Sequence, residues 1–306
     1  MFWGKRSEAG TAEAEQPQGV PEVKKILMAT DLSARSDRAL DRAVQLSGEH
    51  GASLQILHIV DEDLPVSVQD KAAEVAQAEI RAALKKADPG DKSEAVITVM
   101  PGKADQDIIE SANDADADLI IMGVHRNVPE GKPLVGTTVE RVIRFGERPV
   151  LVAPSVVQGP CQKAMIAVDF SVFSRFAIRA ALALAPCAEV YAVHAYHVPF
   201  QGFQHGRQAR KDVADDHERR LAALIEEEMK AIIDVSASAR RAADVKMIIR
   251  HGEVLSVLRA EADRLQPDLL VLGTHGRVGV ANAMFGSIAE SFLTDPFCDT
   301  LAVKAW

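Results

Sequence analysis

Cysteine is scarce in this sequence of 306 residues. Its three cysteines, Cys161, Cys187 and Cys298, are too few and too scattered for a disulfide framework or a CxxC site. We therefore expect small buried or incidental thiols. A reducing cytoplasm is the location that this cysteine usage favours.

The sequence also lacks an excess of basic charge, a long apolar run and a signal-peptide pattern. The formal net charge is -9 at pH 7, which argues against nucleic acid or an anionic membrane surface as the main partner, because both call for a basic face. No apolar run approaches the length of a membrane span. Residues 1–22 have no apolar core like that of a signal peptide, and we interpret them as a flexible tail.

What is present is an internal duplication. An apolar run followed by Asp31 recurs at Asp169, an offset of 138 residues. Further along, Gly123 recurs at Gly273, now at an offset of 150, because the second copy carries extra residues in its middle. Hydrophobic residues make up 47% and charged residues 26% of the chain, as in soluble globular proteins, and the length suits two domains.

Each copy alternates apolar strands with helices. In the first copy we expect strands at 25–30, 53–60, 95–100, 118–122 and 149–153, and helices at about 36–47, 68–87, 104–114 and 137–145. Ser33 and Ser171 stand where helix N-caps belong. The pattern predicts two α/β domains in tandem, over 23–155 and 161–306, each with a doubly wound, five-stranded parallel sheet of the Rossmann-like type.

The longest helix is expected at 207–234. Its predicted apolar stripe consists of Leu221, Leu224, Ile225, Met229, Ile232 and Ile233. Ahead of it, residues 197–205 form a loop that the first copy lacks, and we interpret this loop as a surface insertion.

The stretch from Asp268 to Glu290 carries the strongest functional signal. An apolar strand ends at Gly273, a loop with Gly276 follows, and Gly286 precedes a helix. Such a loop and helix start offer unpaired N–H groups to an anion such as phosphate, and glycine permits close approach and positive φ. The motifs GxxxxGK[ST] and GxGxxG both fail, since no lysine follows the glycines and their spacing differs.

The spacing of Gly273, Gly276, Gly286 and Ser287 resembles the nucleotide motif of the universal stress protein family, Gly-x2-Gly-x9-Gly-Ser/Thr. The resemblance covers nearly everything from Lys24 to Trp306 and identifies a tandem member. In that family two domains pair through their last strands, here 149–153 and 300–303. The tandem arrangement implies an intramolecular pseudo-dimer, in which each apolar edge strand covers the other.

The resemblance also assigns contacts to ATP, or to AMP or ADP, with Mg²⁺ as an accompanying ion. These lie where strand ends converge in an open sheet. In the second domain the assigned residues are Ala167, Val168 and Asp169 at adenine and ribose, Ala195 at the adenine edge, and Leu272, Gly273, His275, Gly276, Gly286, Ser287 and Ile288 around ribose and phosphates.

Alternatives remain open for several of these polar residues. Asp169 could instead be a turn or capping carboxylate, and His275 could be a solvent-facing loop residue. A metal held by His194 and His197 is disfavoured, because residues three apart in a strand point to opposite faces.

The first domain departs from the motif. The equivalent residues are Asp31, Ile59, Gly123, His125, Gly136 and Thr137, but Arg126 replaces the second glycine. If that position needs a left-handed backbone, arginine costs about 1–2 kcal/mol, although its guanidinium could itself meet a phosphate. We therefore expect a weaker or altered first site.

The sequence thus predicts a cytoplasmic, non-catalytic stress-response protein that binds an adenine nucleotide and acts on an unknown protein partner, with further homodimerisation left open. Nothing in it demands turnover, since the glycine loop supplies binding only. The alternatives are a slow ATPase or autophosphorylating protein, with Ser287 as first acceptor, and an interaction scaffold with a vestigial or differently liganded pocket. A ligase or flavoprotein reading is disfavoured because neither first strand ends in a serine-glycine-rich loop.

Overall fold

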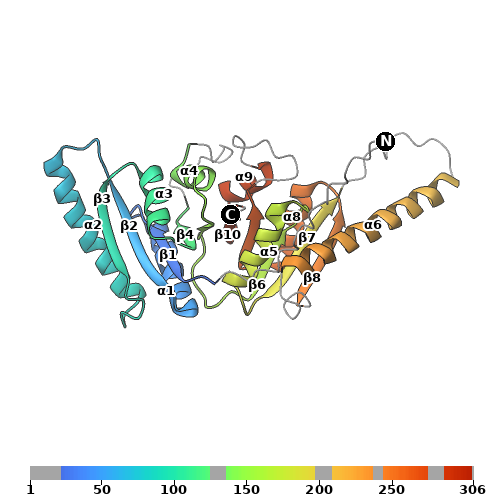
Figure 1. Ribbon diagram of the computed structural model, residues 1–306, viewed down its shortest axis with the longest axis horizontal. Helices are drawn as coiled ribbons and strands as arrows, with labels where there is room; N and C mark the ends of the chain where they lie inside the picture. Colours follow the sequence, from blue (N-terminus) through green and yellow to red (C-terminus); the bar gives the residue numbers. More distant parts are fainter. Residues whose placement is uncertain (1–21, 125–135, 197–208, 237–243, 275–285, 305–306) are drawn as a thin grey trace, which may run out of the picture.

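The computed structural model of the protein describes residues 22–124, 136–196, 209–236, 244–274 and 286–304. Residues 1–21 of the expected tail and the expected loop at 197–205 lie outside these residues, as do His125, Arg126, His275 and Gly276. All strands join one ten-stranded sheet, in the order β3-β2-β1-β4-β5-β10-β9-β6-β7-β8. Figure 1 shows this sheet running the length of the molecule.

The first copy contributes one half of the sheet. Its strands are β1 (Lys25–Ala29), β2 (Ser53–Asp61), β3 (Val96–Gly102), β4 (Leu119–Met122) and β5 (Val150–Val152). Its helices are α1 (Ala34–His50), α2 (Val66–Ala87), α3 (Ala104–Asp114) and α4 (Thr138–Phe145). All strand pairs within this half are parallel.

The second copy repeats the arrangement. Its strands are β6 (Lys163–Ala167), β7 (Glu189–Tyr196), β8 (Val245–His251), β9 (Leu269–Gly273) and β10 (Asp299–Val303). The helices among its described residues are α5 (Val172–Leu184), α6 (Ala209–Ser236), α8 (Val254–Leu265) and α9 (Ser287–Thr294). The strand order of each half reverses at its first strand, so the predicted doubly wound tandem fold is confirmed.

Helices cover both faces of the sheet, and each face forms one core that runs through both domains. Residues of α1, α2, α5 and α6 pack on one face, and residues of α3, α4, α8 and α9 pack on the other. Along β1, Ile26 and Met28 belong to the first core and Leu27 belongs to the second. This alternation is why the strands read as continuous apolar runs.

The helix boundaries follow local capping. Ser33 accepts a hydrogen bond from the backbone N–H of Ser36, and Ser171 does the same for Ser174, as predicted for N-caps. α1 extends to His50, beyond its predicted end, because Gly51 takes the left-handed conformation (φ 62°) that terminates it.

The predicted apolar stripe on α6 was wrong at one residue, Leu224. Ile225, Met229, Ile232 and Ile233 are buried, but Leu224 is 59% exposed. Consecutive helical residues are about 100° apart around the axis, which turns Leu224 to the flank of the stripe. The side chain of Leu221 lies outside the described part of the helix.

The two domains join through their last strands, as predicted. β5 and β10 are antiparallel, with Leu151 opposite Leu301, Val152 opposite Thr300 and Val150 opposite Ala302. This register is symmetric about the central leucine pair, so a pseudo-twofold axis passes through it. Each edge strand is therefore covered by its counterpart.

A lysine fastens the same junction from the second domain. Lys304 donates from Nζ to the carbonyl oxygens of Arg144, at 2.5 Å, and Gly146, at 2.8 Å, at the end of α4. A cation at a helix C-terminus is favourable, because the carbonyl groups there lack partners within the helix.

The cysteines are unpaired thiols, as expected. Cys298 is buried, Cys161 partly buried and Cys187 exposed. Burial raises the pKa of the Cys161 thiol to about 12, which keeps it protonated and unreactive.

In the part of the chain that the structure describes, no helix combines the length and the apolar character needed to cross a bilayer.

Candidate nucleotide site

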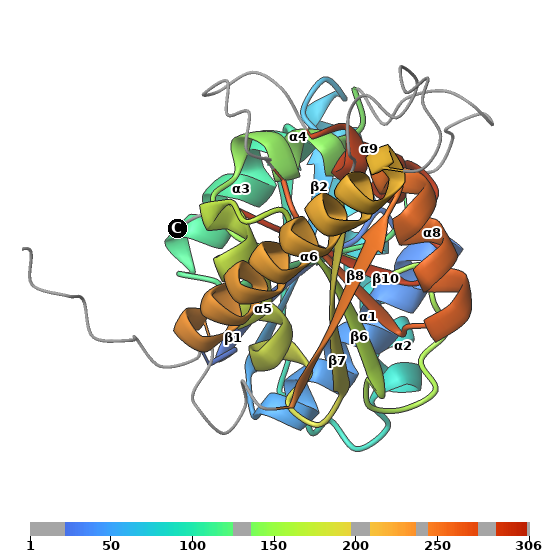
Figure 2. The same cartoon turned by 90° about the vertical axis from the view of Figure 1, so that its right-hand side faces the viewer.

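A cavity of about 210 Å³ lies at the carboxyl ends of β6, β7 and β9. The start of α9 and one side of α8 complete its wall. α4 and α9, the helices that follow the two glycine motifs, lie near each other on the same face of the sheet, close to the domain junction (Figures 1 and 2). The second-domain strand order reverses at β6. The cavity is therefore at the switch point where ligands bind open α/β sheets.

Most of the residues expected at the second site line this one cavity: Ala167, Val168, Asp169, Ala195, Leu272, Gly273, Gly286, Ser287 and Ile288. The structure adds lining residues that sequence reasoning missed, among them Ser174, Val254 and Leu258. Ser174 could have been found from its repeat partner Ser36. Val254 and Leu258 carry no motif, since they reach the cavity only through the placement of α8.

Asp169 is held in place by the first turn of α5. Its Oδ1 accepts from Ser174 Oγ at 2.7 Å and from the backbone N–H of Ser171 at 3.0 Å. Its own backbone N–H donates to Ser174 Oγ at 3.0 Å. One oxygen thus serves the turn, as the structural alternative proposed. Within the described chain the other oxygen, Oδ2, has no hydrogen-bond partner.

The residue after this aspartate is strained in both domains. Phe170 has φ 63° and Leu32, its counterpart, has φ 60°. A left-handed conformation costs a bulky residue about 1–2 kcal/mol. The same strained turn therefore presents Asp31 and Asp169 at the two equivalent strand ends.

A histidine ties each of these turns to the neighbouring strand. Nδ1 of His194 lies 2.7 Å from the carbonyl oxygen of Val168, and Nδ1 of His58 lies 2.9 Å from that of Thr30. Because a carbonyl can only accept, each imidazole carries its proton on Nδ1. His194 also packs against Phe170, with ring centroids 4.3 Å apart. His194 thus supports the cavity wall, and no group of three or more potential metal ligands occurs among the described residues.

Of the two reasons given for the motif glycines, close approach and positive φ, Gly286 shows a close approach, made by the protein's own backbone. Its φ is -62°, so positive φ was a wrong expectation at this position. A Cβ at Gly286 would lie 3.1 Å from the carbonyl oxygen of Thr274, to which its own N–H donates at 3.0 Å. The close approach of these two backbone segments disfavours a side chain at this position.

The helix start after Gly286 has no side-chain cap. α9 begins at Ser287, and its N-cap is Gly286. In α4 the N-cap Thr137 accepts from the N–H of Glu140 at 3.1 Å, and the Glu140 carboxylate accepts from the N–H of Gly136 at 3.3 Å. In the second domain the corresponding N–H groups, of Gly286 and Glu290, donate to the backbone carbonyl oxygens of Thr274 and Gly286. The two helix starts therefore differ in that side chains cap α4 and no side chain caps α9 beside the cavity.

The first domain keeps the aspartate network but packs its strand ends tightly. Asp31 Oδ1 accepts from Ser36 Oγ at 2.5 Å and from the N–H of Ser33 at 3.0 Å. Burial opposes ionisation, but these hydrogen bonds outweigh it and lower the pKa of Asp31. A Cβ at Gly123 would lie 3.1 Å from the Cα of Ser36, so this glycine lets β4 end against α1. Ile59, at the end of β2, is partly buried.

Comparison with known proteins agrees with this geometry. The model of the universal stress protein family matches residues 22–154 and 160–304. Universal stress protein A homolog 2 of Coxiella burnetii is 29% identical over 118 residues, which cover 38% of this chain and 75% of that protein. A universal stress protein of Methanocaldococcus jannaschii is 28% identical over 153 residues, covering 42% of this chain and 93% of that protein.

Solved structures resemble the whole tandem. A universal stress protein of Archaeoglobus fulgidus superposes with a TM-score of 0.63 at 18% identity, covering 92% of this chain and 98% of that one. A Pseudomonas aeruginosa protein of unknown function gives a TM-score of 0.63 at 19% identity, covering 92% of each chain. At such identities the likeness shows the fold alone.

Proposed function

Since this chain belongs to the universal stress protein family, we propose that its second domain binds an adenine nucleotide, ATP or its relatives ADP and AMP. The observation that carries this proposal is the meeting of three strand ends with an uncapped helix start around one cavity. The uncapped helix start suits an anion, and the strand ends suit a base and a ribose.

Phosphate would lie at the start of α9. Ser287 and Ile288 line the cavity there, and the backbone N–H groups of this first turn carry the positive end of the helix dipole. A hydrogen bond to a charged oxygen is worth about 1.5–3 kcal/mol, so a few such donors can hold phosphate without a lysine. His275 and Gly276 would extend this site, and Mg²⁺ would accompany a polyphosphate.

The nucleoside would lie between the strand ends. Val168, Val254 and Leu258 offer apolar surface to the adenine ring, and the backbone of Ala195 offers hydrogen bonds to its edge. Asp169 would accept from the ribose hydroxyls through Oδ2, because Oδ1 is held by the turn.

The first domain would bind more weakly. Thr137 and Glu140 cap the start of α4 by accepting from the N–H groups of Glu140 and Gly136, and Arg126 stands in place of the second motif glycine. The Glu140 carboxylate, which lies at this helix start, would repel the phosphate of a nucleotide.

The biological role that fits is a non-catalytic cytoplasmic regulator, whose nucleotide occupancy alters its contacts with a protein partner. Its cavity supplies binding groups, and the account expects no turnover of ATP. Mass spectrometry of protein incubated with ATP and Mg²⁺ should show no phosphate on Ser287. A phosphoserine there would instead favour the autophosphorylation alternative.

Calorimetric titration of two matched variants tests the site. Ser287→Asp places a carboxylate at the start of α9, and Thr138→Asp makes the same change at the start of α4. Both should keep the fold, because an acidic residue in the first helical turn is favourable by about 0.3–1 kcal/mol. Repulsion between carboxylate and phosphate should weaken ATP binding by about tenfold or more in Ser287→Asp and leave it unchanged in Thr138→Asp. Equal affinity in both variants would refute the placement.

A further inference from the structure

The two domain contacts that flank the β5–β10 pair are unequal, although the pseudo-twofold axis relates them. The offset of 138 residues places Ala180 of α5 where α1 has Arg42, and Ala183 where α1 has Gln45. The offset of 150 places Pro149 where the second domain has Asp299. One side of the junction therefore carries large polar side chains that the other side lacks.

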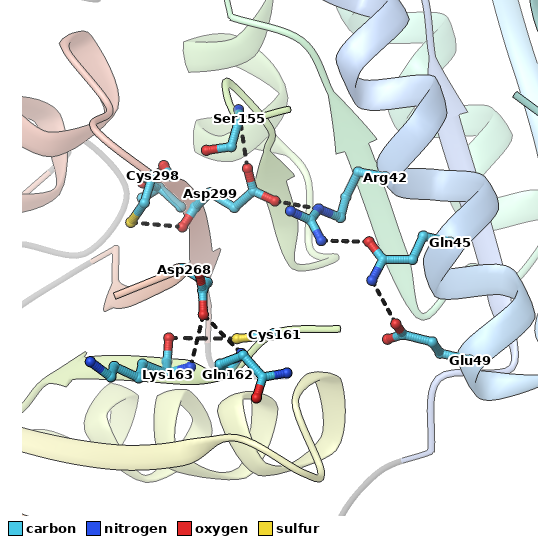
Figure 3. Close-up of polar contacts among 11 residues, drawn as sticks. Arg42, Gln45, Glu49, Ser155, Cys161, Gln162, Lys163, Asp268, Cys298 and Asp299 are labelled. Atoms are coloured by element: carbon cyan, nitrogen blue, oxygen red, sulfur yellow. Dashed lines mark hydrogen bonds and ion pairs between the residues drawn. The ribbon is translucent and has the colours of Figure 1, made fainter. Parts of the chain in front are cut away.

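On the side of the junction where α1 faces β10, which we call the first side, these polar side chains fill the space between the domains (Figure 3). Arg42 Nε lies 2.6 Å from Asp299 Oδ2, with the two side chains 9% and 4% exposed. The Nε–H does not point along this line, so the contact is an ion pair and not a directed hydrogen bond. Arg42 also donates to Gln45 Oε1 at 2.5 Å. A cation from the chain itself thus fills the space between α1 and β10.

On the second side the corresponding space is a cavity of about 270 Å³. Ala180, Ala183 and Pro149 all line it, together with Leu184 and Leu301. The second side thus has alanine, alanine and proline at the positions where the first side has arginine, glutamine and aspartate. The cavity is therefore the volume that the missing side chains leave behind.

The rim of this cavity is acidic. Glu22, Asp118 and Glu147 supply three carboxylates, against the single guanidinium of Arg148. Arg148 pairs with Asp116 at 3.0 Å, and Glu22 pairs with Lys24 at 2.8 Å. Asp118 accepts from the backbone N–H groups of Lys24 and Lys25. Among the described residues Glu147 is the rim carboxylate without a hydrogen-bond or ion-pair partner. An apolar interior below an unpaired carboxylate suits a ligand with a short apolar body and a cationic head.

We propose that this interdomain cavity binds a small organic cation, a guanidinium or ammonium group on a short alkyl chain. The ligand would take the place that Arg42 holds across the pseudo-twofold axis. The cavity lies at the amino ends of β4 and β5 and shares no lining residue with the nucleotide cavity, so the two sites are separate. Since its lining comes from both domains, a bound cation also stabilises their pairing.

Saturation-transfer NMR with butylguanidinium as the probe tests the proposal on the intact chain. Butyrate, which has a similar apolar body and the opposite charge, is the control ligand. We expect saturable binding of butylguanidinium and none of butyrate. No saturable binding of the cation, or equal binding of both compounds, would overturn the proposal.

Three variants locate the binding. Ala180→Arg supplies the side chain that fills the equivalent space on the other side and should abolish saturable binding. Glu147→Gln removes an exposed rim charge without touching the core and should weaken binding about threefold. Glu110→Gln, an exposed glutamate on α3, should leave binding unchanged. Unchanged affinity in Glu147→Gln and in a folded Ala180→Arg would place the cation elsewhere and defeat the inference.

Discussion

Leu151 of the first domain lies directly opposite Leu301 of the second, in the middle of the antiparallel pair that joins the two sheets. Both side chains are 1% exposed, and they belong to a core that runs through both domains. The central leucine pair thus makes one continuous sheet out of two copies of the same unit.

Shortening this pair should destabilise the whole chain. Leu151→Ala removes buried methyl groups and leaves a cavity, so we expect the free energy of unfolding to fall by about 2–5 kcal/mol. Leu224→Ala is the matched control, because Leu224 is 59% exposed and should change stability by less than about 0.5 kcal/mol. Urea denaturation followed by circular dichroism measures both. Equal effects of the two substitutions would contradict the assignment of the junction.

Replacing Arg42 should lower the free energy of unfolding, because the buried carboxylate of Asp299 loses its ion-pair partner. Burial raises the pKa of Asp299, and the nearby Arg42 guanidinium opposes that rise. Arg42→Met leaves the carboxylate unpaired, which typically costs about 3–5 kcal/mol. Arg42→Met combined with Asp299→Asn should recover part of this loss. A double variant less stable than Arg42→Met alone would argue against the ion pair.

The same pair gives a pH dependence with a definite sign. A carboxyl group whose folded pKa is raised favours the native state when protonated, so its contribution to stability falls as pH rises from the unfolded pKa, about 4, through the folded pKa. Arg42→Met removes the guanidinium that opposes the rise in the pKa of Asp299, so it should widen the pH range between the unfolded and the folded pKa. The destabilisation by Arg42→Met, measured by urea denaturation at a series of pH values, should therefore be larger at neutral pH than near pH 4. A pH-independent loss would contradict this reading.

Asp31 should contribute to the pH dependence of stability with the opposite sign. Its pKa is lowered by hydrogen bonds that outweigh burial, so its contribution is present above the unfolded pKa and is lost as pH falls through the folded value. Ser36→Ala removes one of these hydrogen bonds and should raise the pKa of Asp31, as followed by the carboxyl carbon shift in an NMR titration. Ser47→Ala is the control, because the Ser47 hydroxyl donates to the carbonyl oxygen of Ala52. This substitution should leave the pKa of Asp31 unchanged.

Helix capping should differ between the two motif helices. Thr137 caps α4, so Thr137→Ala should cost about 1 kcal/mol. Ser287, its counterpart by sequence, makes no cap, and Ser287→Ala should cost less. Thermal denaturation of the two variants compares them. A larger loss for Ser287→Ala would contradict the difference between the two helix starts.

Sequence patterns predicted the fold because burial imposes strong periodicity on this chain. The helix expected at 104–114 spans Ala104–Asp114, and the partner strands β5 and β10 were identified as apolar edges. Helix ends were less predictable. α1 runs three residues past its expected end, to a glycine whose conformation depends on the loop that follows.

The cavity was predictable only where a motif or a repeat marked it. Asp169 and Gly286 were found, and both line the cavity. Positive φ was wrong for Gly286, and its close contact with Thr274 is a tertiary contact that the sequence does not show. Val254 was not predicted, because its place in the cavity also depends on a tertiary contact. No local pattern in α8 indicates that Val254 faces β6 and β7. The unequal sides of the domain junction likewise emerge only once the two copies are placed about their axis.

Calorimetric titration of ligand-stripped wild-type protein with ATP, and with AMP for comparison, tests the central claim most directly. The account predicts one nucleotide bound tightly per chain, in the second domain, with any first-domain binding clearly weaker. Two equal and independent sites, or no binding of either nucleotide, would contradict it.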